Sequence, residues 1–292
     1  MFEILNKQIL ASDIKRIDVH APAIAKKIHP GQFVSICPQE GDERIPLTVI
    51  EFNVNKGTLT FIFQEKGAAT TKLGELAIGE EIFSILGPLG IPAKIERLGT
   101  VVCIATGIGA AQILPICRAF KQAGNKVIGI IGAKTKKALM LEAQMRLSCN
   151  QFYISTNDGS YERRGLATDI LKTLMGQQKV ELVYAIGSHD MMQEACLLTQ
   201  TKNIPTRVCL NPVMVDCMGM CGSCRIKVGG KMVLACIDGP EFDGHQVDFK
   251  DFGIRLKAYE ELATWHSQKS QLNPPRSERR ILPKFLADIL KS

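Results

Sequence analysis

The stretch Val101–Ala133, VVCIATGIGAAQILPICRAFKQAGNKVIGIIGA, decides the fold of this chain. It opens with an apolar run rich in β-branched residues, passes through a segment with helical periodicity, and closes with a second apolar run. Parallel strands need a crossover of this kind between them, and a helix usually supplies it. The stretch therefore predicts the first strand, helix and second strand of a parallel α/β sheet.

The same alternation of strand and helix patterns continues toward the C-terminus. Two further strand-and-helix pairs follow, and they read QFYIST with ATDILKTLMGQ and ELVYAIG with HDMMQEACLLTQTK. We therefore expect a nucleotide-binding α/β domain over residues 99–208. Ligands of such sheets bind at the carboxyl ends of the strands, and the candidate binding residues at these ends are Gly107, Gly109, Asp158 and Gly187.

The turn at Gly107 and Gly109 joins the first strand to the first helix, where glycines let phosphates approach a helix N-terminus. It lacks the third glycine of the ordinary dinucleotide fingerprint, and no acidic residue ends the second strand. Lys134, Lys136 and Lys137 follow that strand instead. They could meet a 2′-phosphate, but lysines at a helix start are usually just solvated.

Residues 1–98 have a different pattern. Short alternating or β-branched runs follow one another between Gly, Pro and Asn turns: ILNKQIL, IKRIDVHA, FVSICP, LTVIEFNV, TLTFIFQ and GEEIFSILGPLG. Strands in such close succession predict an antiparallel β-barrel. The predicted fold is therefore a multidomain β and α/β protein.

A dense group of cysteines distinguishes the segment VDCMGMCGSCRIKVGGKMVLACIDGP, residues 215–240. Zinc usually takes two Cys-x2-Cys knuckles or a Cys/His mixture, whereas a plant-type 2Fe-2S loop has ligand-x4-Cys-x2-Cys and a distant Cys. Cys221, Cys224 and Cys236 fit the second pattern. Asp216 has the x4 spacing of the remaining ligand and Cys217 is the softer donor, so the spacing leaves both open. We expect a cluster domain over 209–258.

Composition excludes several function classes. The 292 residues carry a formal net charge of +7, and without a basic stripe interleaved with aromatics we expect no nucleic-acid partner. No signal peptide or long apolar segment is evident, so we expect no membrane association, and reduced cysteines indicate the cytoplasm. Residues 259–292 are expected to form a helical, basic tail.

Two runs carry a resemblance to a known family: LNPVMVDCMGMCGSC, residues 210–224, and LACIDGPEFDGHQVDF, residues 234–249. Over about residues 1–265 the chain resembles the FAD- and iron-sulfur-containing electron-transfer subunits related to ferredoxin-NADP reductase. These include the small subunit of NADH-dependent ferredoxin:NADP oxidoreductase and the electron-transfer subunit of dihydroorotate dehydrogenase. The first cluster ligand of the former is an aspartate followed by glycine, so the resemblance favours Asp216 over Cys217.

The resemblance also implies flavin-binding residues in the barrel. They lie in two segments, of which the first forms the flavin-binding strand and the second a turn that could cradle a pyrophosphate: Arg44, Pro46, Leu47 and Thr48, then Phe63, Gly67, Thr70 and Thr71. Without the family, the first segment is an ordinary barrel strand with one charged end. A threonine hydroxyl in the second could equally cap the helix.

The implied function is that of an NAD(P)H-dependent flavin and iron-sulfur oxidoreductase subunit. Electrons would pass between NAD(P)H, FAD and a 2Fe-2S cluster to a larger flavin/iron-sulfur subunit, and through a bifurcating complex to ferredoxin and NADP. The resemblance implies NAD rather than NADP as the nucleotide of this chain. A dihydroorotate dehydrogenase subunit in pyrimidine biosynthesis and a non-enzymatic, zinc-stabilised nucleotide sensor are the alternatives. No catalytic side-chain set is evident, because the cofactors supply the chemistry.

Overall fold

The computed structural model describes residues 2–258. Residues up to Phe249 belong to one compact unit, and Lys250 begins a second unit whose described residues, 250–258, are helical. The predicted helix at 259–271 and the rest of the predicted tail lie outside the described residues. The domain limits given above remain predictions.

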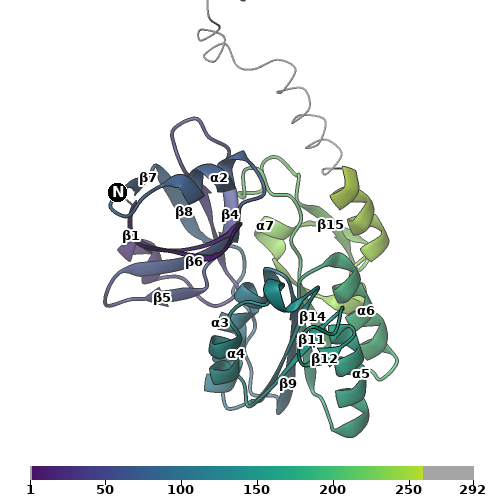
Figure 1. Ribbon diagram of the computed structural model, residues 1–292. Helices are drawn as coiled ribbons and strands as arrows, with labels where there is room; N and C mark the ends of the chain where they lie inside the picture. Colours follow the sequence, from purple (N-terminus) through teal and green to yellow (C-terminus); the bar gives the residue numbers. More distant parts are fainter. Residues whose placement is uncertain (1, 259–292) are drawn as a thin grey trace, which may run out of the picture. The chain divides into compact units, whose positions relative to one another are not determined.

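The N-terminal part consists of two antiparallel sheets (Figure 1). The larger sheet has the order β5-β6-β2-β1-β7, and its strands are β1 (Phe2–Ala11), β2 (Ile14–His20), β5 (Glu51–Asn53), β6 (Thr58–Gln64) and β7 (Glu81–Ile82). The smaller sheet has the order β4-β3-β8, with β3 (Phe33–Cys37), β4 (Ile45–Thr48) and β8 (Ser84–Leu89). Residues of both sheets share one apolar core. The predicted antiparallel β structure is therefore confirmed.

Two of the expected strands are divided. The run LTVIEFNV was expected as one strand, but β4 and β5 belong to different sheets, with Val49 and Ile50 between them. Both side chains are almost fully buried, whereas the side chains of a regular strand alternate between the two faces of its sheet. The chain crosses from one sheet to the other at this point. Phe83, which is exposed, separates β7 from β8, and these two strands also belong to different sheets.

Two short helices complete this part of the chain. The helix α1 (Pro22–Ala25) follows β2, and α2 (Ala68–Glu75) follows β6. Their buried residues Ile24, Ala25 and Leu73 belong to the core shared by the two sheets. Both helices therefore pack their apolar side against the β structure.

The central part is a mostly parallel sheet of order β12-β11-β10-β9-β13-β14-β17. Its parallel strands are β9 (Thr100–Thr106), β10 (Lys126–Ala133), β11 (Gln151–Thr156), β12 (Arg163–Arg164), β13 (Leu182–Ile186) and β14 (Thr206–Cys209). Helices α3 (Gly109–Gln122) and α4 (Glu142–Ser148) lie on one face, and α5 (Ala167–Gln177) and α6 (His189–Gln200) on the other (Figure 1). The predicted parallel α/β architecture is confirmed.

The strand order positions the functional region. β9 is the first strand in sequence, and it lies between β10 on one side and β13 on the other. The connections from these strands therefore leave in opposite directions. A crevice at such a point, outside the carboxyl ends of the strands, is where open α/β sheets bind ligands.

The segment after β14 is mostly irregular up to residue 224. It continues with a hairpin of β15 (Arg225–Val228) and β16 (Lys231–Leu234), the short helix α7 (Ala235–Asp238), and β17 (Glu241–Asp243). β17 pairs antiparallel with β14 and so joins the edge of the parallel sheet. Among residues 2–258, no helix combines the length and apolar character that crossing a bilayer requires.

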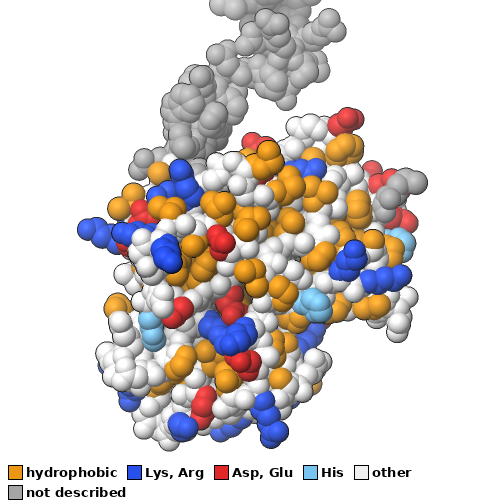
Figure 2. Space-filling view, turned by 180° about the vertical axis from the view of Figure 1, so that it is seen from behind, with side chains coloured by type: hydrophobic (Ala, Val, Ile, Leu, Met, Phe, Trp, Pro, Cys, Tyr) orange, Lys and Arg blue, Asp and Glu red, His pale blue; other side chains and the backbone are white. Residues whose placement is uncertain are grey.

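An ion pair connects the β part to the α/β part. The Glu51 carboxylate of β5 accepts from Arg16 of β2 at 3.1 Å and from Arg118 of α3 at 2.6 Å. Charges of both signs are interspersed among apolar side chains on the face shown in Figure 2. The pair to Arg118 fixes α3, which begins at the predicted nucleotide turn, against the barrel strands.

Candidate cofactor sites

The predicted nucleotide turn lies at the crevice between β9 and β13. Gly107 has φ +57°, a left-handed conformation that favours glycine, and a Cβ on it would project into open space. A Cβ on Gly109 would lie 2.5 Å from the carbonyl oxygen of Ile186, at the end of β13. A Cβ on Gly187 would collide with the Thr106 hydroxyl. The structure therefore brings these three predicted glycines together.

Two hydroxyl residues that were not among the predicted binding residues complete this turn. The backbone N–H of Ser188 donates to Thr106 Oγ1 at 3.0 Å, and Ser188 Oγ accepts from the N–H of Met191 at 3.4 Å. Ser188 is thus the N-cap of α6. Because α3 also begins here, two helix N-termini converge at the crevice, which favours a negatively charged group.

Asp158 lies in the turn after β11, two strands away from β9. Its Oδ1 accepts from the Ser160 hydroxyl at 2.7 Å and from the Ser160 N–H at 3.0 Å. These bonds hold the pKa of the exposed Asp158 carboxyl below its usual range. The structure therefore places Asp158 at the predicted carboxyl edge, away from the three glycines.

Arg44 leads into β4, the predicted flavin-binding strand. Its Nη2 donates to Ser84 Oγ at 3.2 Å, while its buried Nη1 has no hydrogen-bond partner among the described residues. A buried guanidinium nitrogen without an acceptor is costly. The site therefore suits an added anionic group such as a phosphate. Pro46, Leu47 and Thr48 follow on β4 and are half-buried.

The second predicted flavin segment divides between core and surface. The side chain of Phe63 is 2% exposed and belongs to the core of the two sheets, so a ligand could meet only its backbone. Thr70 Oγ1 accepts from the N–H groups of Lys66 and Gly67, both at 3.0 Å, and donates to the Gly67 carbonyl. Its hydroxyl therefore caps the start of α2.

The remaining residue of this segment behaves differently from Thr70. Thr71 is exposed and its backbone N–H donates to the Gly67 carbonyl. Its hydroxyl makes no hydrogen bond within residues 2–258. Of the two threonines, Thr71 therefore keeps a hydroxyl that is available to a ligand.

The loop that carries the cysteines is organised by Asp216. Its Oδ1 accepts from the N–H of Met218 at 2.9 Å, and its Oδ2 accepts from Met220 at 2.8 Å and Cys221 at 2.6 Å. These backbone donors hold the pKa of the Asp216 carboxyl below its usual range. The carboxylate is thus ionised, which a metal ligand must be, and it closes the loop from Asp216 to Cys221.

Two of the predicted cysteine ligands lie in contact. The Sγ atoms of Cys224 and Cys236 are 3.3 Å apart and both residues are buried. Two sulfurs bound to one tetrahedral metal at about 2.3 Å would lie about 3.8 Å apart. The pair therefore has nearly the separation that sharing one iron requires. Burial and the neighbouring Cys224 raise the pKa of Cys236 to about 12.

Cys221 differs from this pair because it is exposed. Partial burial opposes ionisation of its thiol, but the Ser223 hydroxyl, 3.2 Å from Sγ, and backbone hydrogen bonds from Asp216 and Ser223 together outweigh it, so the pKa of Cys221 lies below its usual value. Cys221 is also the residue whose N–H bonds to Asp216. Of the four predicted ligands, Cys224 and Cys236 are therefore in side-chain contact, while Asp216 is connected to Cys221 through the backbone N–H of that residue.

A two-iron cluster takes two protein ligands on each iron, beside two bridging sulfides. Within the part of the chain that the structure describes, no three His, Cys, Asp or Glu residues converge on a single metal ion. One aspartate and three cysteines at these positions are a donor set that could hold a 2Fe-2S cluster.

Cys217 differs from the four predicted ligands in its surroundings. Its side chain is fully buried, its φ is +64°, and its thiol lies against the hydroxyl of Ser35 on β3. Burial raises the pKa of the Cys217 thiol, with the Ser35 hydroxyl opposing the shift. Ser35 was not a predicted site residue, and it pairs in register with Pro46 of the predicted flavin strand. The cluster loop and the flavin strand therefore both contact Ser35.

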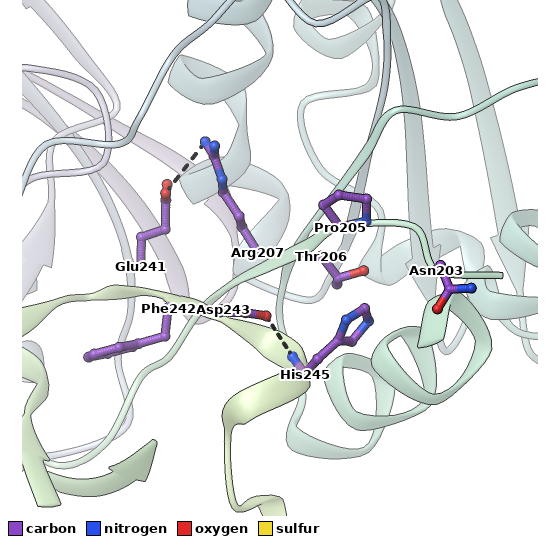
Figure 3. Close-up of a pocket in the computed structure, with 8 residues that line it drawn as sticks. All are labelled: Asn203, Pro205, Thr206, Arg207, Glu241, Phe242, Asp243 and His245. Carbon is purple, nitrogen blue, oxygen red and sulfur yellow. Dashed lines mark hydrogen bonds and ion pairs between the residues drawn. The ribbon is translucent and has the colours of Figure 1, made fainter. Parts of the chain in front are cut away.

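A cavity of about 480 Å³ lies along β14 and β17, and none of the predicted site residues lines it (Figure 3). Arg207 and Glu241 face each other at its edge, with Arg207 Nη1 3.6 Å from Glu241 Oε1. Arg207 Nη2 also bonds Glu96 at 3.0 Å, and burial raises the pKa of Glu241. These contacts fasten the cluster segment to the sheet edge.

Comparison with known proteins adds to this geometry. Residues 211–248 match the iron-sulfur cluster binding domain of dihydroorotate dehydrogenase B. The chain is 39% identical to an uncharacterised protein of Clostridium beijerinckii encoded in the adh 3′ region, over 89% of this chain and 90% of that protein. It is 37% identical to a homologue of the dihydroorotate dehydrogenase B (NAD(+)) electron transfer subunit from Thermotoga maritima, over 89% and 92% of the two chains.

A solved structure extends the likeness to three dimensions. A chain of the NADH-dependent reduced ferredoxin-NADP oxidoreductase, described in connection with flavin-based electron bifurcation, superimposes with a TM-score of 0.87 at 35% identity. The match covers 94% of this chain and 98% of that one. The likeness therefore includes the β part, the α/β part and the cluster segment together.

Proposed function

The chain belongs to the family of dihydroorotate dehydrogenase B electron-transfer subunits and their homologues, and from this premise we propose its role in an electron-transfer complex. It is a flavin and iron-sulfur oxidoreductase subunit of the ferredoxin reductase type. We propose that it connects a nicotinamide nucleotide, FAD and a 2Fe-2S cluster to a larger flavin/iron-sulfur subunit of a bifurcating ferredoxin:NADP oxidoreductase. The likeness over 94% of the chain to the ferredoxin-NADP oxidoreductase structure carries this proposal.

The FAD site is proposed on the face of β4. Arg44 offers the FAD phosphates a guanidinium nitrogen that has no acceptor among residues 2–258, and Pro46, Leu47 and Thr48 offer their strand to the flavin ring. Gly67 and Thr71 at the start of α2 would meet the pyrophosphate, with Thr70 capping that helix. FAD supplies the exchange between electron-pair transfer and single-electron transfer.

The nucleotide site is proposed at the crevice between β9 and β13. Gly107 and Gly109 let phosphates approach the N-terminus of α3, and Gly187 keeps the ends of β9 and β13 in contact. Asp158 would contribute from the end of β11. The role of these residues is binding and orientation, since none of them is placed to transfer a proton.

The cluster site is proposed at Asp216, Cys221, Cys224 and Cys236. The role of the first two residues is to hold the exposed side of the cluster, and the two buried cysteines hold the inner side. Exposed apolar side chains surround this loop: Val215 at 55%, Met218 at 44%, Met220 at 84% and Ile237 at 48% exposure. Such a rim suits contact with a protein partner. The free state of all ten cysteines supports a reducing compartment, the cytoplasm.

Purification of the native complex under anaerobic conditions tests the proposal. We expect a yellow-brown preparation with flavin and iron, a larger flavin/iron-sulfur subunit in stoichiometric amount, and flavin bleaching by a reduced nicotinamide. A colourless protein that contains zinc would contradict the proposal. A dihydroorotate dehydrogenase catalytic chain in the eluate would assign the subunit to the other complex of this family.

A further inference from the structure

An ion pair connects the two segments at which the FAD phosphates are proposed to bind. Nζ of Lys72, on α2, pairs with Oδ1 of Asp42, which lies thirty positions earlier in the chain. Asp42 lies two residues before Arg44, and Lys72 directly follows Thr71. The pair therefore joins the chain immediately beside both of the residues that would meet the phosphates.

The Asp42 side of this pair belongs to an ordered turn. Asp42 Oδ2 accepts from the N–H of Gln39 at 3.2 Å, and the N–H of Asp42 donates to the Gln39 carbonyl at 3.1 Å. The thiol of Cys37, the last residue of β3, lies 3.3 Å from the Asp42 carbonyl. The Asp42 side chain is only 10% exposed, and among residues 2–258 Lys72 is the one cation within ion-pair distance of it. Loss of Lys72 would therefore leave a nearly buried charge without a counter-ion, which is unfavourable.

The Lys72 side of the pair belongs to a helix that is anchored in the core. Leu73, the next residue, is fully buried and belongs to the core shared by the two sheets. The Thr70 hydroxyl caps the start of the same helix. Lys72 itself is 45% exposed. The core thus fixes how α2 is turned, and the ion pair fixes where the turn that contains Asp42 lies relative to it.

The two cations of this region differ in what they leave for a ligand. Nη1 of Arg44 is buried and has no acceptor among the described residues. Nζ of Lys72 already has the Asp42 carboxylate, so its charge is compensated. A phosphate would therefore satisfy an open donor at Arg44, whereas at Lys72 it would compete with an existing ion pair. This difference indicates a role in positioning for Lys72 rather than direct phosphate binding.

We propose that Asp42 and Lys72 are positioning residues for FAD, and that their ion pair holds the segment of Arg44 and the start of α2 together so that both contact one pyrophosphate. The inference rests on the proposed FAD site and adds the pair that preforms it. Neither side chain contacts FAD itself. A site that is ordered before its ligand arrives loses less conformational freedom on binding. The pair therefore increases the affinity for FAD.

Binding of FAD and of riboflavin to the cofactor-free full chain, followed by flavin fluorescence, tests this inference. Lys72→Met and Asp42→Asn should each weaken FAD binding about tenfold, because FAD must then order the two segments itself. The double variant should bind FAD no more weakly than either single variant, since all three lack the same ion pair. Riboflavin has no pyrophosphate, so its affinity should stay unchanged in all three. Urea midpoints of the cofactor-free variants should be non-additive in the same way.

Lys179→Met is the matched control. Lys179 pairs with Glu181 at 3.2 Å, and Glu181 likewise accepts from a backbone N–H, that of Thr100 at 2.7 Å, but this pair lies in the α/β part between α5 and β13. Its loss should leave FAD affinity unchanged.

Two results would overturn the inference and leave the proposed function intact. One is an unchanged FAD affinity in both single variants. The other is weaker FAD binding by Lys72→Met together with tighter binding by Asp42→Asn, because Lys72 would then contact the phosphates itself and Asp42 would compete with them. Failure of the original chain to bind FAD would instead contradict the proposed function.

Discussion

The sulfur atoms of Cys224 and Cys236 lie 3.3 Å apart, although twelve positions separate the two residues in the chain. The hairpin of β15 and β16 lies between them and returns the chain so that the N–H of Ala235 bonds the carbonyl of Cys224. Half of the predicted cluster site is therefore preformed by a regular element. The other half, Asp216 and Cys221, depends on an irregular loop that closes through one carboxylate.

Substitution of the candidate ligands tests whether Asp216 or Cys217 is the fourth cluster ligand. We expect Cys221→Ser to abolish the visible absorption of the cluster and Asp216→Ala to impair it strongly, because Asp216 both closes the loop and offers an ionised oxygen. Cys217→Ala should leave the absorption nearly intact, since its thiol lies against Ser35. Absorption and electron paramagnetic resonance of the reduced proteins check the order. A larger effect of Cys217→Ala would transfer the fourth ligand to Cys217.

Alanine at two glycines of the nucleotide turn should have unequal effects. Gly109→Ala places a Cβ 2.5 Å from a backbone carbonyl that cannot move aside easily, so we expect a loss of about 2 kcal/mol or more in the free energy of unfolding. In Gly107→Ala the added Cβ lies in open space, so only the left-handed φ is unfavourable. We expect it to reduce the free energy of unfolding by about 1 kcal/mol. Urea unfolding of both variants measures the difference. Equal losses would contradict the close approach of α3 to β13.

The raised pKa of Glu241 predicts that the stability of the protein depends on pH. Burial raises its pKa above the usual 4.5, and Tyr184 and Arg207 only partly oppose the shift. A raised pKa means that the folded state binds more protons, so this contribution is full below pH 4.5 and is lost as the pH rises through the folded pKa. The variant Glu241→Gln does not titrate. Its stability relative to the original chain should therefore increase with pH.

Urea midpoints of the two proteins, measured at several pH values from about 4.5 to 8, check the sign of this difference. Glu75→Gln is a suitable control because Glu75 is the exposed last residue of α2. The difference in stability between Glu241→Gln and the original chain could instead stay constant with pH. That result would mean that the attraction of Arg207 fully offsets the effect of burial on the pKa of Glu241.

Variants of Cys217 test whether its left-handed backbone conformation strains the cluster loop. Its φ of +64° costs a residue with a Cβ about 1–2 kcal/mol, and burial of its small side chain offsets about 1 kcal/mol. Cys217→Gly should therefore change the free energy of unfolding by less than about 1 kcal/mol. Cys217→Ala keeps the strain and loses the sulfur contact with Ser35, so it should be the less stable of the two variants. The reverse order would contradict the left-handed conformation.

The sequence was sufficient for the elements whose residues are buried on both faces. The run KVIGIIGA, predicted as a strand, coincides with β10, because consecutive β-branched residues suit a parallel strand covered by helices on both sides. The division of LTVIEFNV between two sheets could not be predicted. Val49 and Ile50 are apolar in either arrangement, and only tertiary packing determines that both are buried at a crossing.

The same distinction between local sequence and tertiary contacts applies to the candidate sites. The glycines at strand ends could be located, because their place between a strand and a helix is a local property of the sequence. The contact of Cys217 with Ser35 could not, and neither could the Arg44 nitrogen that has no partner within the described part of the chain, since each depends on segments far apart in the sequence. Local spacing also could not show that the Thr70 hydroxyl is occupied by its own helix.

The central sheet ends on very short strands at both sides. β12 has two residues at one edge, and β17 has three at the other. A long free edge presents unpaired backbone groups on which strands of other molecules can grow, and aggregation begins in this way. Edges this short offer few such groups. Short edges therefore disfavour strand-to-strand pairing between copies of the subunit. Association with other chains then depends on side-chain surfaces.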